Sequence, residues 1–178
     1  MLEAALRSAP GAAKGENLMQ LLRKLAPNAL SLFMAVIFLD SLRYKFTNHP
    51  KTQEIFGRLD AWAGSLGAPG LFAQTGLFSQ YVIGGAELAA SALLIAGMAP
   101  RFGHLQALGA LVGLAVMTGA VSFHLFTPLG TDPNNDGGGL FIAACINLAA
   151  AILVLTVFRR KETTLLLCRL WRVVAPAE

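Results

Sequence analysis

The sequence predicts an all-α integral membrane protein whose helices form a four-helix bundle, and three observations carry this prediction. Of the 178 residues, 55% are hydrophobic and only 13% are charged, whereas about a quarter of the residues in a soluble domain are charged. The mean hydropathy is +0.59. Apolar stretches of about the 20 residues that cross a hydrocarbon core lie at about residues 27–46, 79–98, 104–127 and 138–158.

Residues 1–26 precede the first predicted span, and we expect them to form a cytoplasmic, interfacial segment. They lack the apolar core and small-residue cleavage site of a removed signal peptide. Leucines and lysines fall on opposite helical faces: Leu18, Leu21, Leu22 and Leu25 against Lys14 and Lys24. This pattern is typical of an amphipathic helix on a membrane surface. Pro27 is predicted to open the first spanning helix, where a missing N–H costs nothing.

The long connection over residues 47–78 is predicted to hold a second amphipathic helix. Its apolar residues recur at helical spacing: Ile55, Phe56, Leu59, Trp62, Ala63 and Leu66. Glu54 and Arg58 form an i,i+4 pair on the opposite face. Such a helix either shields the ends of the spanning helices or forms a lid over a binding site, and the sequence leaves both open.

Small residues predict close packing of the third span. Gly109 and Gly113 form a GxxxG motif, which lets membrane helices approach closely. Pro100 separates the second span from the third, and Pro128 begins the glycine-rich connection to the fourth. Residues 159–178 are predicted to be a basic amphipathic tail.

Lysine and arginine counts near the span ends predict the orientation. Residues 1–26 hold four and the tail after Phe158 holds five, whereas the connection between the third and fourth spans holds none. Both termini are therefore predicted to be cytoplasmic in a bacterial inner membrane, with the long loop in the periplasm.

Because the basic residues gather at loops, the net charge of +4 does not indicate nucleic-acid binding. The expected partners are the lipid bilayer and protein subunits, of other kinds or as a homo-oligomer.

Polar residues lie within the apolar stretches, where a charge is costly and is turned inward, paired or used. They are Asp40, Arg43, Glu87, His124 and Asn147. From the outer helix ends, Asp40 is ~9 Å deep and Glu87 ~12 Å deep, so both can meet His124 in one layer, and we expect Arg43 to pair with Glu87. The layer is either a network that fixes helix register, a site for a small polar ligand or quinone headgroup, or a proton or ion pathway.

Complete catalytic motifs are missing from the sequence. Cys145 and Cys168 do not form a CxxC motif, so neither a disulfide framework nor a thiol–disulfide enzyme is predicted. His104 and His124 lie at opposite ends of one predicted helix, roughly 30 Å apart, too far to ligate one haem. The sequence therefore gives no motif-based reason to predict an enzyme.

Residues 132–137 match the start of a calcium-binding loop. Asp132, Asn134 and Asp136 would supply oxygen ligands. The usual bidentate glutamate is missing, because the twelfth position is Ala143. Turn-forming residues explain this composition equally well, so a calcium site and a plain turn both remain open.

Together these motifs resemble the DoxX-like family of small bacterial membrane proteins. The matching pieces are Leu42-Arg-Tyr-Lys-Phe-Thr47, Tyr81-Val-Ile-Gly-Gly-Ala-Glu87-Leu and Ser122-Phe-His-Leu-Phe-Thr-Pro-Leu-Gly130, with the acidic, glycine-rich loop before Leu140. The likeness covers roughly residues 27–158. It implies a four-helix membrane bundle, and some members are subunits of sulfur- or quinone-linked oxidoreductase systems.

The sequence and this resemblance leave three functions open. The first is an accessory or structural subunit of a larger, redox-linked membrane complex, for which the charged tails and the long loop suit docking. The second is a quinone-interacting oxidoreductase component with its site in the outer half of the bundle. The third is a small proton-coupled transporter centred on Glu87.

Overall fold

The structure, a computed structural model, describes the backbone of residues 10–175 and the side chains of 19–172 and 174–175, and every regular element in this part is helical. The prediction of an all-α fold is thereby confirmed. The elements are α2 (Pro10–Phe46), α3 (Pro50–Ser65), α4 (Gln80–Ala96), η1 (Pro100–Phe102), α5 (Gly103–Phe126), α6 (Gly139–Leu153), η2 (Val154–Phe158) and α7 (Arg160–Val174).

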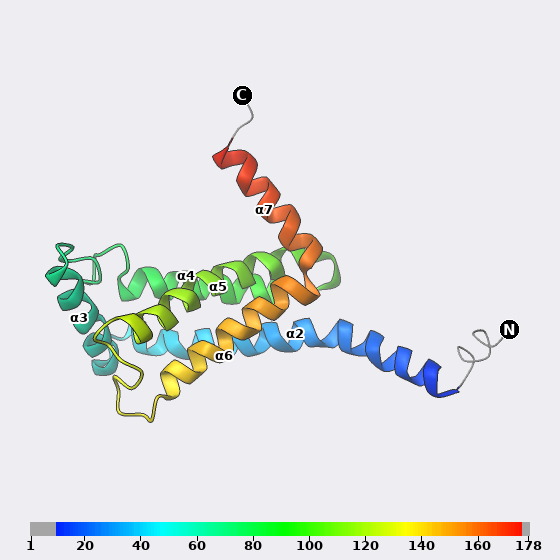
Figure 1. The fold of residues 1–178 in the computed structure, drawn as a ribbon, viewed down its shortest axis with the longest axis horizontal. Helices are drawn as coiled ribbons and strands as arrows, with labels where there is room; N and C mark the ends of the chain where they lie inside the picture. Colours follow the sequence, from blue (N-terminus) through cyan, green and yellow to red (C-terminus); the bar gives the residue numbers. More distant parts are fainter. Residues whose placement is uncertain (1–9, 176–178) are drawn as a thin grey trace.

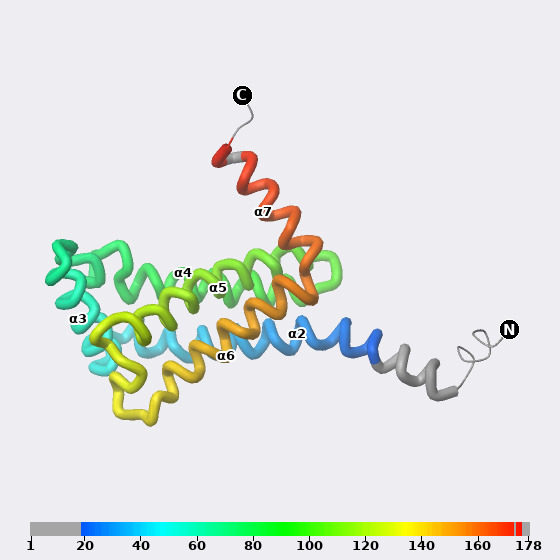
Figure 2. Tube along the Cα trace, in the orientation of Figure 1, coloured from blue at the N-terminus to red at the C-terminus, as the bar shows by residue number. Residues whose placement is uncertain are grey.

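Four helices, α2, α4, α5 and α6, run alongside one another (Figure 1), and we call them the packed helices. α4 contacts α2 and α5, and α6 contacts α5 and α2. α3 lies at one end of the packed helices, the α3 end. α7 leaves the opposite end, the α7 end, and turns away from the other helices (Figure 2).

Three stretches of the described chain are long and apolar enough to cross a membrane: Met19–Phe46, Pro100–Phe126 and Gly139–Phe158. They correspond to the first, third and fourth predicted spans. α4 is apolar but has 17 residues, or about 26 Å at 1.5 Å per residue, near the lower limit for a span. The helix is shorter than predicted because the Ser79 side chain caps its start and the chain turns after Gly97.

The first helix differs from the prediction at its start. α2 continues unbroken from Pro10, so residues 10–26 are not a separate surface helix, and Pro27 lies inside the helix rather than at its first turn. An internal proline removes one backbone hydrogen bond, but membrane helices tolerate this where neighbouring groups supply partners. The carbonyl oxygen that loses its partner here is that of Arg23, four residues earlier. One turn further along, the Gln106 side chain of α5 donates to the Pro27 carbonyl oxygen at 3.2 Å, so α5 contacts α2 at the proline. The predicted positions Lys14 and Leu18 lie outside the described side chains.

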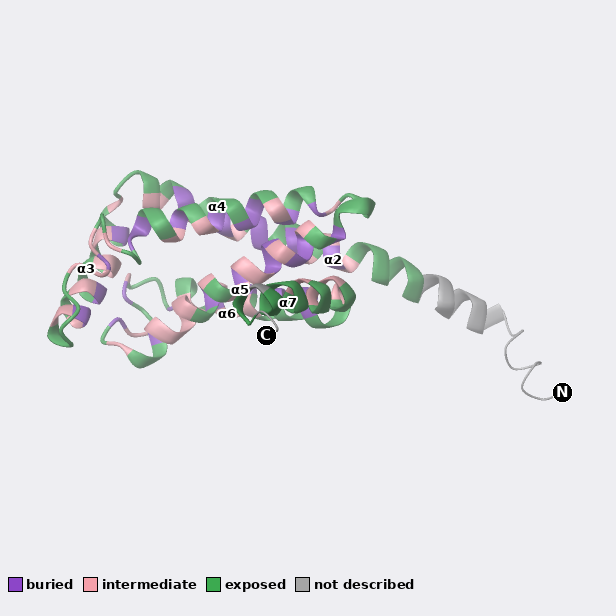
Figure 3. Cartoon of the chain, turned by 90° about the horizontal axis from the view of Figure 1, so that it is seen from above, coloured by how far each residue is buried: buried purple, intermediate pink, exposed green. Residues whose placement is uncertain are grey.

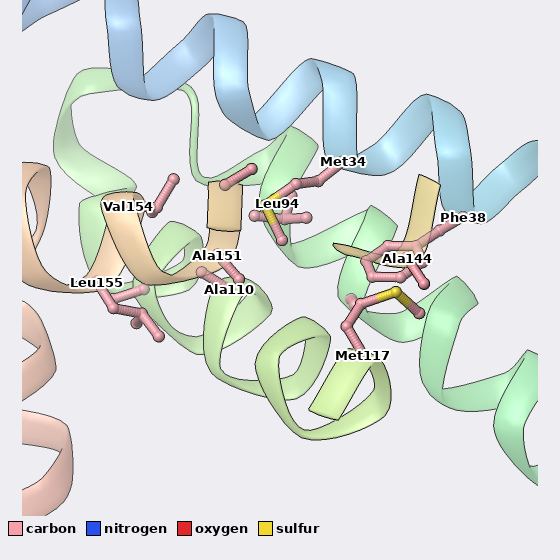
Figure 4. Close-up of a cluster of buried hydrophobic side chains, with 12 residues drawn as sticks. Met34, Phe38, Leu94, Ala110, Met117, Ala144, Ala151, Val154 and Leu155 are labelled. Carbon is pink, nitrogen blue, oxygen red and sulfur yellow. The ribbon is translucent and has the colours of Figure 1, made fainter. Parts of the chain in front are cut away.

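The hydrophobic core runs between the packed helices, where Met34 and Phe38 of α2 lie with Leu94, Met117 and other buried residues (Figure 4). A Cβ atom at Gly109 would lie 2.8 Å from the Leu94 backbone nitrogen. The close helix approach that the GxxxG motif predicts is therefore present between α4 and α5.

The outward faces of the packed helices are exposed (Figure 3) and carry large apolar side chains. They include Leu32, Val36 and Leu39 of α2, Leu88 of α4, Leu125 of α5 and Ile146 of α6. A helix of a soluble protein carries polar residues on this face. The exposed apolar faces are suited to contact with lipid.

A π-helical turn, η2, separates α6 from the tail. The Arg159 N–H donates to the Val154 carbonyl oxygen, five residues earlier, at 2.8 Å, and Thr163 Oγ1 lies 3.1 Å from the Leu155 carbonyl oxygen. Such turns accompany kinks in helices, and the chain changes direction here (Figure 1). The tail beyond it is the amphipathic helix α7, with Leu170 and Trp171 exposed.

Candidate functional site: a cavity at the α3 end

A cavity of about 590 Å³ lies among the packed helices at the α3 end. Ligand pockets in proteins typically have volumes of about 300–1,000 Å³. Most of the wall is apolar and includes Ile37, Phe38, Phe56, Leu59, Phe72, Met117, Phe123 and Leu129. Polar residues of the wall include Ser41, Lys45, Thr52, Glu87 and His124.

α3 contributes Thr52, Phe56 and Leu59 to the wall of this cavity. The two predictions for the loop helix, a shield for the helix ends and a lid over a binding site, both stay predictions. Leu59 and Ala63 are buried in a second hydrophobic cluster with Phe72 and Leu129. The outward ion pair of Arg58 with Glu54 is present, with Nε 2.6 Å from Oε1. Leu66, predicted on the buried face, is exposed because it lies just beyond the last helical turn.

Hydrogen bonds around Asn48 hold the start of α3 against α4. Asn48 adopts the left-handed conformation, with φ of 54°, which asparagine tolerates better than most residues. Its Oδ1 accepts from Gln80 Nε2 at 2.6 Å and from the Tyr81 hydroxyl at 2.8 Å. Gln80 also donates to the Lys45 carbonyl oxygen at 2.8 Å and accepts from Gln53 at 2.6 Å. The turn before α3 is thereby joined to the first turn of α4.

Glu87 forms an ion pair with Lys45, so the prediction that Arg43 is the partner of Glu87 was wrong. Lys45 Nζ lies 3.0 Å from Glu87 Oε2 and 3.1 Å from Oε1. The Ser41 hydroxyl donates to Glu87 Oε2 at 2.5 Å and accepts from Lys45 Nζ at 2.9 Å. The side chains are 15% (Lys45) and 4% (Glu87) exposed. Buried charges require both a counter-charge and hydrogen bonds, and this arrangement supplies both.

Arg43 pairs instead with Asp40, whose Oδ1 lies 3.1 Å from Arg43 Nε. The i,i+3 spacing predicts this pairing. Both side chains are exposed, at 65% and 57%, and the guanidinium also lies 4.7 Å from the centre of the Tyr44 ring. Arg43 therefore lies on the outward side of α2 and cannot reach Glu87.

The sequence contains a signal for Lys45. Ser31, Met34, Phe38, Ser41 and Lys45 are spaced three or four residues apart, so they share one helix face. The first three are fully or almost fully buried. Extending this face to the last turn of α2 identifies Lys45 as the cation that points inward.

His124 of α5 is buried, with 5% of its surface exposed, and lines the cavity. Its Nδ1 lies 2.6 Å from the Gly130 carbonyl oxygen. Because a carbonyl oxygen only accepts, Nδ1 must carry the hydrogen, and Nε2 of the neutral ring is then an acceptor. The ring also packs edge-on against Phe141, with centroids 5.5 Å apart. Its orientation is thus fixed by a hydrogen bond and an aromatic contact.

Asn147 is the only described residue whose side-chain nitrogen and oxygen are both enclosed and without a hydrogen-bond partner. It is fully buried and lies one helical turn beyond Ala143 of the cavity wall. Leaving buried polar groups unpaired costs roughly 1–3 kcal/mol each.

Of the five predicted polar residues, the cavity wall includes Asp40, Glu87 and His124 but neither Arg43 nor Asn147.

The carboxylates of the predicted calcium loop accept backbone hydrogen bonds. Asp132 Oδ1 accepts from the Asp136 N–H at 2.7 Å, and Asp136 Oδ1 accepts from the Gly139 N–H at 3.0 Å. The bond from Asp136 is the main cause that holds the pKa of Asp132 below its usual 3.8. Within residues 10–175 no group of three or more His, Cys, Asp or Glu is placed to hold a metal ion. Calcium binding by Asp132, Asn134 and Asp136 stays a prediction.

No protein-family model, curated protein or solved structure matches the chain. The resemblance to the DoxX-like family therefore stays a prediction. The chemistry of the cavity has to be inferred from its own residues.

Proposed function

We propose that the chain is an integral membrane protein that binds a small, largely apolar molecule with a polar end in the cavity at the α3 end. The cavity itself carries the proposal, because most of its wall is apolar and its polar residues come from several different elements. This is the usual composition of a small-molecule site. A quinone-type ring with an apolar substituent fits this distribution of chemistry.

The membrane placement is supported by the outward apolar faces of the packed helices. In the proposal α4 crosses together with the three longer stretches, giving a bundle of four spans. The lysines and arginines near the span ends favour cytoplasmic termini in a bacterial inner membrane. The cavity then lies in the periplasmic half of the bundle.

The geometry favours binding over proton-coupled transport. A carboxylate that carries protons must gain and lose hydrogen-bond partners during the cycle. Both oxygens of Glu87 already lie within hydrogen-bonding distance of Lys45, and one also accepts from Ser41. This saturated pair is suited to holding α2 against α4.

Quenching of Trp62 fluorescence tests the proposal. Trp62 packs against the cluster that covers the cavity, and Trp171→Phe leaves it as the only tryptophan. We expect a decyl-benzoquinone to quench Trp62 saturably in lipid nanodiscs. Ala143→Phe, in the cavity wall, should abolish saturation, whereas Ala149→Phe, on the exposed face of the same helix, should preserve it. Equal, non-saturating quenching in all three proteins would refute the proposal.

A second candidate function, an accessory subunit of a larger redox-linked complex, is favoured by α7. This helix leaves the packed helices (Figure 1) and exposes Leu165, Leu170 and Trp171 beside Arg169 and Arg172. Purification in a mild detergent should then yield a stoichiometric partner protein that is lost when Leu170 and Trp171 are replaced by serine. Recovery of the chain alone, or only as a homo-oligomer, would count against this candidate.

A further inference from the structure

We propose that His124 Nε2 is the ligand-recognising atom of the cavity and that it selects a molecule with a hydroxyl group. This inference rests on the proposed function and deepens it. It commits to the ligand class: a phenol or alcohol with an apolar body, and a quinol in preference to the corresponding quinone.

The two buried charged groups of the wall, Lys45 and Glu87, already satisfy one another. The three hydrogens of Lys45 Nζ face Ser41 Oγ and both oxygens of Glu87, at 2.9–3.1 Å. The Ser41 hydroxyl donates to Glu87 in return. A ligand would have to break this buried pair to use it, and breaking such a pair is costly.

His124 Nε2, by contrast, makes no hydrogen bond within the described residues, since the ring bonds only through Nδ1. Enclosed polar atoms without a partner occur, in this part of the chain, only on Asn147. Nε2 is therefore unpartnered but not enclosed, and its ring lines the cavity. It faces space that a ligand can occupy.

The chemistry of Nε2 is fixed by the other ring nitrogen. The Gly130 carbonyl oxygen requires a hydrogen on Nδ1, so the neutral ring presents a lone pair at Nε2. The matching ligand atom must donate a hydrogen. A hydroxyl group does so, whereas an ether or quinone oxygen can only accept.

Thr52 does not alter this selection. It is buried on α3, lines the same cavity, and its hydroxyl makes no hydrogen bond within the described residues. A hydroxyl can donate or accept, so Thr52 can serve a phenol, an ether or a ketone alike. The remaining polar residues of the wall are exposed or half-buried, so water can reach them; they are Asp40, Tyr44, Lys51, Asn134 and Asp136. Discrimination between these ligands in the buried part of the wall falls to His124.

Binding of two matched probes tests the inference. Radiolabelled 4-decylphenol and 4-decylanisole differ only in that the O–H of the first is O–CH₃ in the second. Their binding to the protein in nanodiscs is measured against the mole fraction of probe in the lipid. The signal of empty nanodiscs is subtracted. We expect the wild type to bind the phenol about 3- to 10-fold more tightly, the range for one net hydrogen bond. In His124→Phe the ratio should fall to about 1 while anisole binding persists.

His124→Gln provides the second variant, because its amide oxygen can still accept. We expect it to keep a ratio above 1, and it remains informative if His124→Phe does not fold. A wild-type ratio of 1, a preference that survives His124→Phe, or a preference that His124→Gln loses would each overturn the inference. Binding of neither probe to the wild type would instead refute the proposed cavity ligand itself.

Discussion

The two ends of the packed helices both hold buried polar residues, but they use them differently. At the α7 end, Gln106 Nε2 lies 2.8 Å from Ser31 Oγ and 3.2 Å from the Pro27 carbonyl oxygen. Its Oε1 accepts from Arg159 Nε at 2.5 Å. The amide thereby joins α2, α5 and the start of the tail, with both ends of the side chain occupied.

At the α3 end, the polar residues surround a cavity. The Lys45–Glu87 pair there is as complete as the Gln106 network, but His124 Nε2 has no hydrogen-bond partner among the described residues. The difference shows that a polar residue in an apolar helix does not by itself indicate a site. Unused hydrogen-bonding capacity beside open space does, and the following experiments separate the two roles.

The largest effect is expected from Lys45→Met, which leaves Glu87 buried without its counter-charge. Removing one partner of a buried pair costs about 3–5 kcal/mol. The matched variant Arg43→Met, on the same helix, removes an exposed pair and should cost about 0–1 kcal/mol. Reversible unfolding in mixed detergent micelles measures both free energies.

The double variant Lys45→Met/Glu87→Met controls for lost packing. It should recover most of the stability, because no charge is left buried without a partner. If Lys45→Met costs no more than Arg43→Met, the buried pair does not hold α2 against α4.

Gln106→Leu is the corresponding change at the α7 end. It removes an amide with occupied hydrogen bonds and should lower the free energy of unfolding by about 1–3 kcal/mol. Ligand affinity at the α3 end should stay unchanged. A loss of 4-decylphenol binding in this variant would show that the two ends of the packed helices are coupled and do not have separate roles.

Asn147→Leu should raise stability. Within the described residues the amide is enclosed and unpartnered, and a leucine has a similar branched shape but no polar group to desolvate, so a gain of about 1 kcal/mol is expected. The same unfolding assay measures it. A destabilised variant would mean that the amide has a partner in the membrane, such as an ordered water molecule.

The smallest effect concerns the turn at Asp132. The Asp136 N–H holds the pKa of Asp132 below 3.8 in the folded chain. Ionised Asp132 therefore stabilises the fold at pH values above the pKa that Asp132 has in the unfolded chain. This contribution disappears as the pH falls through the lowered folded-state pKa. The melting temperature of the wild type should therefore exceed that of Asp132→Asn at pH 6, and the difference should shrink as the pH falls below about 4. A difference that is constant with pH would contradict this role.

Hydrophobic patterning was sufficient to predict the helices. Burial and lipid contact both require apolar residues at particular positions along each helix, and these positions can be recognised in a short stretch of sequence. The spacing of Leu59 and Ala63 predicted the buried face of α3, and the Gly109 motif predicted a close helix contact. Pro27 was misplaced because the first turn is the favoured position for a proline, whereas membrane helices also tolerate one in their interior, as α2 does.

The candidate site was predicted in part. Depth alone placed Glu87 and His124 in one layer, and both line the cavity. Depth could not assign the partner of Glu87, since Arg43 and Lys45 are two residues apart and differ in helix face. Nor could it show that Nδ1 of His124 is already bonded to Gly130, because that contact depends on how the loop after α5 turns back.

Locating a bound ligand tests most directly whether the cavity at the α3 end is a binding site. A diazirine derivative of 4-decylphenol would be photolysed with the protein in nanodiscs and the labelled residues mapped by mass spectrometry. We expect labels on cavity residues such as Met117 and Phe123, suppressed by excess 4-decylphenol and absent in Ala143→Phe. Labels confined to outward residues such as Val36 and Leu125, and unaffected by competition, would show that the ligand does not bind in the cavity.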